Sequence, residues 1–249
     1  MEPVQTKTYK YVSDIYPYLM RFIDYDSWAM YYHTLTNDYL DNNSTVLELA
    51  AGNCKLCCGL KSYFNDVIAS DLSIEMLKKS EVNNITRVCC NMEALPFRKT
   101  FDLIISAFDS VNYLLTKKSF TNLLNEVRIA LKDNGIFSFD VSLEKNSLKN
   151  LRYLNRKGTY KGIKYIQRSE YDRDKMLHTN KFKLTLEDGQ EFIEIHKQRI
   201  FPLETYFDLI VSNGFMVREC FDAFSLNDAT EESERVQFIV MKEKKNVII

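Results

Sequence analysis

Two short apolar runs end in residues that suit a ligand site. Thr45–Leu49 has the length of a strand and leads into Ala50-Ala51-Gly52, where small side chains permit a sharp turn and a close ligand approach. Val67–Ser70 is a second apolar run, and it ends at Asp71, about 20 residues after the turn. Neighbouring parallel strands form a ligand crevice at their carboxyl ends, where such an acid binds a ribose diol. The spacing therefore predicts a site for a nucleoside cofactor.

The residues that follow the turn narrow the choice of cofactor. A dinucleotide site needs glycines spaced GxGxxG, so that a pyrophosphate can sit on a helix N-terminus. Here only Gly52 fits, and the next two positions are Cys54 and Cys57. The phosphate-binding loop GxxxxGK[ST] is absent from the sequence as well. A nucleoside cofactor without a pyrophosphate remains, and S-adenosylmethionine is the leading candidate.

The segment resembles the first two motifs of class I S-adenosylmethionine-dependent methyltransferases of the small-molecule type. These motifs read E/D-x-G/A-x-G-x-G, followed by an acid after the second strand, and Leu72–Leu77 resembles the sequence that follows this acid in the family. Cys54 departs from the pattern at the third glycine. The resemblance implies a cofactor site formed by Glu48, Ala50, Gly52, Asp71, Leu72, Met76, Asn91, Met92 and Ala107.

Asn91 and Met92 follow the third predicted strand, Thr86–Cys90. The family has an acid where this chain has Asn91, and that acid accepts a hydrogen bond from the adenine amino group. The amide oxygen of Asn91 can accept the same bond without charge. Met92 would pack on the adenine, with ordinary core packing as the alternative.

Two further stretches resemble substrate-facing parts of the family. Ile15–Trp28 is similar to an N-terminal segment that folds over the cofactor as a lid, and Ala107–Leu114 is similar to the floor between cofactor and substrate. The predicted substrate contacts are Tyr16, Asp109, Asn112, Tyr113 and His196. The candidates for a general base are Tyr16, Asp109, Tyr113 and His196. Helix capping by Asp109 and a structural pairing of His196 are the competing interpretations.

The elements that must position these residues alternate regularly. Five strand–helix alternations from Thr45 to Val141 predict a parallel sheet, and Phe215–Phe221 with Arg235–Met241 would close it as an antiparallel hairpin. We therefore expect an α/β fold with a Rossmann-like, seven-stranded, mostly parallel sheet and helices on both faces. Residues 1–150 and 202–249 would form this cofactor-binding domain.

Residues 151–201 have a different pattern. Gly158–Tyr171, Met176–Leu186 and Glu191–Phe201 alternate apolar and polar residues, and Asp188-Gly189 is a hairpin signal. They predict an antiparallel β meander inserted after the fifth strand. The resemblance implies that this insert roofs the active site.

Composition excludes several other classes of protein. The chain has 249 residues, of which 45% are apolar and 27% charged, as in globular proteins. Its net charge of -1 gives no global attraction for nucleic acid. No run approaches a membrane span and the first residues lack a signal-peptide core, so a cytoplasmic location without a membrane partner is expected. The six cysteines could suggest zinc, but free thiols in a reducing compartment are favoured and no metal is expected.

The expected reaction is methyl transfer from S-adenosylmethionine to a nitrogen or oxygen nucleophile of a small molecule. That methyl acceptor is the expected partner, and a homodimer is left open. Departures from the family pattern at Cys54, Asn91 and Pro17 keep open a binding protein that has lost catalysis. An RNA methyltransferase is a third alternative, which the neutral charge disfavours.

Overall fold

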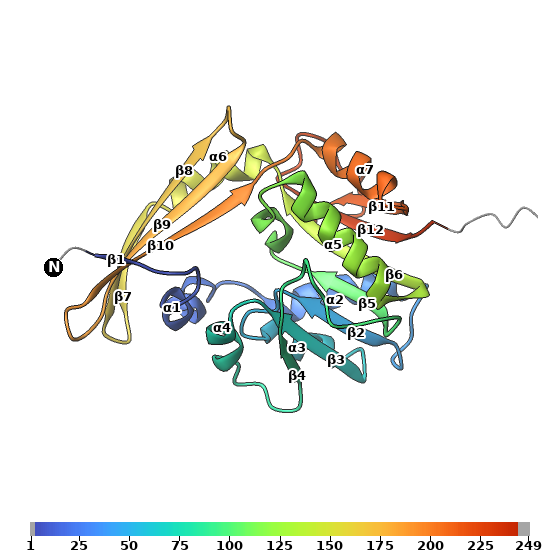
Figure 1. Cartoon of the computed structure of the whole chain (residues 1–249), viewed down its shortest axis with the longest axis horizontal. Helices are drawn as coiled ribbons and strands as arrows, with labels where there is room; N and C mark the ends of the chain where they lie inside the picture. Colours follow the sequence, from blue (N-terminus) through green and yellow to red (C-terminus); the bar gives the residue numbers. More distant parts are fainter. Residues whose placement is uncertain (1–2, 244–249) are drawn as a thin grey trace, which may run out of the picture.

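Residues 3–243 are described by this computed structural model, and they form two separate β-sheets (Figure 1). The larger sheet is built from β2 (Thr45–Leu49), β3 (Asp66–Asp71), β4 (Thr86–Cys89), β5 (Phe101–Ser106), β6 (Leu131–Ser142), β11 (Phe215–Asp222) and β12 (Arg235–Lys242). Its spatial order is β11-β12-β6-β5-β2-β3-β4. The pairs from β4 to β6 are parallel, and β12 is antiparallel to both of its neighbours. The predicted α/β fold with a seven-stranded, mostly parallel sheet is confirmed.

Helices cover both faces of this sheet because its central strands are apolar on both sides. On one face, α2 (Tyr25–Thr36) and α3 (Lys55–Leu60) pack against side chains such as Val46 and Leu103. On the other, α5 (Lys117–Ala130) and α7 (Leu203–Ser212) pack against Leu47 and Ile104. Successive residues of β2 and β5 therefore enter opposite cores, as the two-residue period of a strand requires.

The smaller sheet contains four insert strands and one N-terminal strand. Its members are β1 (Val4–Gln5), β7 (Arg156–Tyr160), β8 (Ile163–Asp172), β9 (Leu177–Thr185) and β10 (Glu191–Arg199). The sequence predicted one strand over Gly158–Tyr171, but Lys161 and Gly162 both have positive φ and turn the chain between β7 and β8. β1 pairs in parallel with β10, so the N-terminus joins the insert.

Four other helical elements place the loops of the site. They are α1 (Val12–Leu19), α4 (Ile74–Lys78), α6 (Glu144–Tyr153) and the 3-10 helix η1 (Ser110–Tyr113). In Figure 1, α1 lies between the smaller sheet and the larger one, on the side of α4. It is attached to the smaller sheet by an apolar cluster that includes Val12, Ile15, Phe182 and Leu184. Among the described residues, no helix is long and apolar enough to cross a membrane.

Candidate active site

The ends of β2 and β3 meet at Asp71. Its Oδ2 accepts a hydrogen bond from the backbone N–H of Gly52 at 2.8 Å, and its Oδ1 accepts one from Ser73 at 2.7 Å. The carboxylate therefore points toward the turn, as the cofactor prediction requires. Each oxygen keeps a second acceptor position, which suits the two hydroxyls of a ribose. Burial raises the pKa of Asp71, and its two backbone donors oppose this shift.

The turn after β2 is shaped by left-handed backbone conformations. Gly52 has φ +56°, and a Cβ built on it would lie 3.0 Å from Met76 Cε. Ala50 and Cys54 also have positive φ, at 51° and 62°. The family glycine that Cys54 replaces would adopt its conformation without strain. The left-handed turn explains why Gly52 is needed there.

Glu48 lies beneath this turn rather than at its surface. It is 2% exposed, and Cys57 Sγ donates a hydrogen bond to its Oε2 at 2.7 Å. Burial raises the pKa of Glu48 to about 8, although the bond from Cys57 opposes the shift. At neutral pH Glu48 is therefore mostly a neutral acid that supports the turn from below.

The remaining predicted cofactor residues lie along the same edge. Leu72, directly after Asp71, exposes 71% of its surface and offers an apolar contact for a ring. Asn91 Oδ1 accepts a bond from the N–H of Glu93 at 3.0 Å, which leaves one acceptor position on that oxygen. Met92 is half-buried against the core, and Ala107 is buried. Their contacts with a cofactor remain predictions.

Tyr9 brings together three residues that the sequence proposed for the substrate side. Its ring centroid lies 6.0 Å from that of Tyr16, 6.1 Å from Tyr113 and 4.7 Å from His196. Tyr113 Oη lies 3.2 Å from His196 Nδ1. Tyr9 is not among the predicted site residues, because no local sequence pattern distinguishes it from the other tyrosines near the N-terminus.

The segment that carries Tyr9 is also attached to the cofactor side. Lys10 Nζ lies 3.3 Å from Glu75 on α4, and Lys79, which follows α4, pairs with Asp14 on α1. The side chains of both pairs are partly exposed. They hold the N-terminal segment beside the helix that follows Asp71, where the predicted lid belongs.

Asp109 is held by protein donors. Its Oδ2 accepts a bond from Arg235 Nη2 at 3.0 Å and its Oδ1 one from Gln198 Nε2 at 3.1 Å. Arg235 also pairs with buried Asp140. The side chain makes no cap hydrogen bond to η1, so the capping interpretation is not supported. The role of Asp109 as a general base or substrate contact remains a prediction. Its hydrogen bonds from Arg235 and Gln198 argue against that role, because they occupy both carboxylate oxygens.

Asn112 is 1% exposed and joins three elements. Its Nδ2 donates to the carbonyls of Ser142 and Arg199 and to the Tyr206 hydroxyl, at 3.2, 2.8 and 3.1 Å. Its Oδ1 accepts a bond from the N–H of Ser142 at 2.9 Å. The substrate contact predicted for Asn112 therefore needs correction, because its amide is occupied in holding η1 to β6, β10 and α7.

The cysteines divide between the core and the surface. Cys54 and Cys57 are buried, whereas Cys58 and Cys89 are exposed. Cys89 is exposed because β4 is the edge strand of its sheet. Within residues 3–243 no group of three or more His, Cys, Asp or Glu side chains is arranged to hold a metal ion.

Comparison with known proteins identifies the architecture. Residues 46–135 match the sequence profile of the family described as "Methyltransferase domain". A provisionally named methyltransferase, YqeM of Bacillus subtilis, is 28% identical over 249 residues, which cover 95% of this chain and 98% of the relative. In sequence, the chain is therefore similar to methyltransferases over nearly its whole length.

Solved structures share this methyltransferase fold. An S-adenosylmethionine-dependent methyltransferase from Clostridium acetobutylicum superimposes with a TM-score of 0.77 at 23% identity, over 95% of this chain and 99% of the other. A sugar N-methyltransferase from Streptoalloteichus gives a TM-score of 0.73 at 16% identity, over 93% and 92% of the two chains. The free acceptor positions of Asp71 are compatible with the ribose of S-adenosylmethionine, the cofactor that the sequence predicts.

Proposed function

We propose that this methyltransferase moves the methyl group of S-adenosylmethionine to a nitrogen or oxygen atom of a small molecule. The observation that carries the proposal is the hydrogen bond from Gly52 to Asp71, which joins the two strand ends next to a group of tyrosines. The sugar N-methyltransferase with the same fold is compatible with such an acceptor.

The cofactor supplies an electrophilic methyl group on a sulfonium, which an aligned nucleophile displaces. Protein groups must therefore orient the acceptor and exclude water, and orientation alone lowers a barrier substantially. Asp71 and the turn at Gly52 would fix the adenosyl end. Tyr16 and Tyr113, which are half-buried and whose pKa values burial raises well above the ordinary value, would border the acceptor and limit the access of water.

A binding protein without catalysis is the second candidate. The observation in its favour is the left-handed conformation of Cys54, which places a Cβ where the family has glycine. Binding of cofactor and product without turnover on any amine or alcohol would support this candidate. Detectable methylation of any acceptor excludes it.

The adenosyl site is tested by calorimetry with S-adenosylhomocysteine. The Asp71→Asn variant keeps the side-chain shape but loses the charge, and we expect binding to weaken by about tenfold to a hundredfold, because charged hydrogen bonds contribute about 1.5–3 kcal/mol. Asp66→Asn, at the exposed opposite end of β3, is the matched control and should bind normally. Equal affinities in all three proteins would refute the proposed site.

A further inference from the structure

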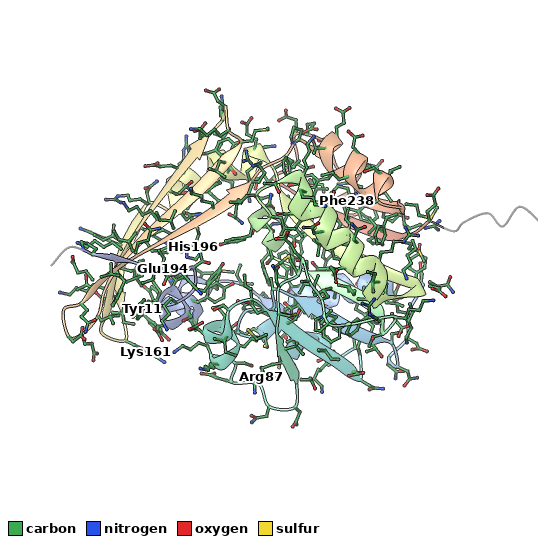
Figure 2. The ribbon with its side chains drawn as sticks, in the orientation of Figure 1. Tyr11, Arg87, Lys161, Glu194, His196 and Phe238 are labelled. Carbon is green, nitrogen blue, oxygen red and sulfur yellow. The ribbon has the colours of Figure 1, made fainter. Side chains whose placement is uncertain are left out.

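Four polar side chains form one continuous row beside the cofactor site. The hydroxyls of Tyr9 and Tyr113 lie 2.8 Å apart, and Tyr113 Oη lies 3.2 Å from His196 Nδ1. The row continues from His196 Nε2 to Glu194 Oε2 over 3.3 Å. It joins the segment before α1, the end of η1 and β10, and Figure 2 shows Glu194 and His196 on the side of β10 that faces α1.

The far end of the row determines where its protons lie. Glu194 is fully buried, and its Oε1 accepts bonds from the backbone N–H groups of Tyr11 and Val12 at 2.5 and 3.1 Å. Two such donors stabilise an ionised carboxylate. A carboxylate can only accept hydrogen bonds, so the ring nitrogen of His196 that faces it must carry a proton. The neutral ring of His196 therefore carries its proton on Nε2 and has a lone pair on Nδ1.

The lone pair on Nδ1 orients the two phenols in turn. Tyr113 donates its hydroxyl proton to His196, and its oxygen is then free to accept the hydroxyl proton of Tyr9. Every proton in the row then points toward Glu194. The oxygen of Tyr9 is consequently the open end, and it can accept a hydrogen bond from a donor group on a ligand.

The two phenols are suited to transmit a proton rather than to keep a charge. Burial raises the pKa of Tyr9 and that of Tyr113 well above the ordinary value for tyrosine. Neither side chain is therefore ionised near neutral pH. His196 is the group in the row that can hold an added proton, because its imidazolium would lie directly against the Glu194 carboxylate.

The side chains around the hydroxyl oxygen of Tyr9 favour the binding of a cation. The negative charge of Asp71 reaches Tyr9, Tyr16 and Tyr113, and burial with this charge raises the pKa of all three phenols. The rings of Tyr9 and Tyr16 meet edge to face at 6.0 Å. Aromatic faces combined with nearby carboxylates attract ammonium groups.

We propose that the methyl acceptor is an amine that arrives protonated, and that its proton passes through Tyr9 and Tyr113 to His196. This inference rests on the proposed function, since it specifies the acceptor of that reaction. An ammonium N–H bond breaks and its proton binds the Tyr9 oxygen, while Tyr9 passes its own proton to Tyr113 and Tyr113 passes its own to Nδ1. The amine becomes neutral and nucleophilic, the imidazole becomes imidazolium, and no electron is transferred. Glu194 is a positioning residue, because it acts only through the ring of His196.

The tautomer of His196 is the first test, and it needs no substrate. The chain has three histidines, so ¹⁵N spectra of the labelled protein can be assigned by comparison with a His196→Gln variant. We expect a neutral ring with its proton on Nε2, and a changed Nδ1 signal in Tyr113→Phe. Tyr11→Phe is the matched control, because its backbone donor to Glu194 and its stacking on Phe192 are retained. A ring protonated on Nδ1 would overturn the proposal.

The second test adds benzylamine or benzyl alcohol to the protein loaded with S-adenosylhomocysteine. The charged or titratable side chains that face His196 are Tyr9, Tyr113 and Glu194, and the ring of Phe182 on β9 adds no charge. Benzylamine should convert His196 to imidazolium and benzyl alcohol should not, and this response should be lost in Tyr9→Phe.

Calorimetry on the same samples separates the two conclusions. If S-adenosylhomocysteine binds but saturating benzylamine leaves His196 neutral, the relay is refuted while the adenosyl site stands. If S-adenosylhomocysteine does not bind, the proposed function itself fails. Glu194→Gln should bind the nucleoside normally and lose the response to benzylamine. A response that persists in Glu194→Gln and Tyr9→Phe would also refute the relay.

Discussion

The buried carboxyl group of Glu48 should make the stability of this fold depend on pH. Its pKa is about 8 in the folded chain against 4.5 for an ordinary glutamate. The folded state therefore holds a proton that the unfolded state releases, so the stabilisation is complete below pH 4.5 and is lost as the pH rises to about 8. One pKa unit corresponds to about 1.4 kcal/mol, so the loss between about pH 5 and pH 8 is about 3 kcal/mol.

The assay is urea unfolding across this pH range for the wild type and for Glu48→Gln. Glutamine has the shape of the neutral acid, and its amide oxygen can still accept the bond from Cys57. Burial raises the pKa of Asp140 to about 6. Asp140 titrates in both proteins, so its contribution to the pH dependence cancels when their stabilities are compared. We expect the wild type to lose about 3 kcal/mol relative to the variant as the pH rises. A difference that stays constant over the range would refute a buried, protonated Glu48.

Two further changes test the networks that hold the loop after β5. Asn112→Ala removes the four hydrogen bonds of a buried amide and should destabilise the fold by about 2–4 kcal/mol in chemical denaturation, because buried partners are left unpaired. A loss of stability no larger than that caused by replacing an exposed residue with alanine would contradict the structural role of Asn112. Arg235→Met leaves the carboxylates of Asp109 and Asp140 facing each other, and we expect a loss of about 3–5 kcal/mol at pH 8. Burial raises the pKa of Asp140 to about 6 and Arg235 opposes this shift, so the variant should take up a proton on Asp140 above pH 6. The loss should therefore shrink as the pH falls from 8 to 6, and a loss that stays constant over this range in the same denaturation series would contradict the pairing.

The larger sheet and the meeting of Gly52 with Asp71 could be predicted because their signals are local. The apolar run that ends at Leu49, the bend at Gly52 and the acid at Asp71 each lie within a few residues of one element. A parallel sheet then brings the strand ends together without any further information.

The smaller sheet shows where the local signals failed. On β10 the buried positions are Phe192, Glu194 and His196, while Ile193 and Ile195 are only half-buried. Alternation correctly separated these two faces but could not tell which one faces the protein, because polar residues usually point to solvent. Glu194 is buried because two backbone donors of another segment satisfy it.

The contacts between Tyr9, Tyr113 and His196 could not be predicted from the sequence for a related reason. Tyr9 and Tyr113 are 104 positions apart, and Tyr113 and His196 are 83 apart. Neither the α1 helix, which contains Pro17, nor the pairing of β1 with β10 has a strong local pattern. Without those two elements nothing places Tyr9 beside His196, so a contact between them could not be expected.

The N-terminal segment is held more firmly by the insert than by the cofactor-binding sheet. Two partly exposed ion pairs join the N-terminal segment to Glu75 on α4 and to Lys79, which follows α4. Exposed pairs of this kind contribute about 0–1 kcal/mol each to stability. On the other side it is joined by the β1–β10 pairing, by an apolar cluster and by two backbone bonds to a buried carboxylate. The apolar cluster and the Glu194 carboxylate are buried, so water and salt weaken their contacts less than they weaken exposed ion pairs. Tyr9 therefore keeps its place against His196 even if the ion pairs to α4 open to admit a ligand.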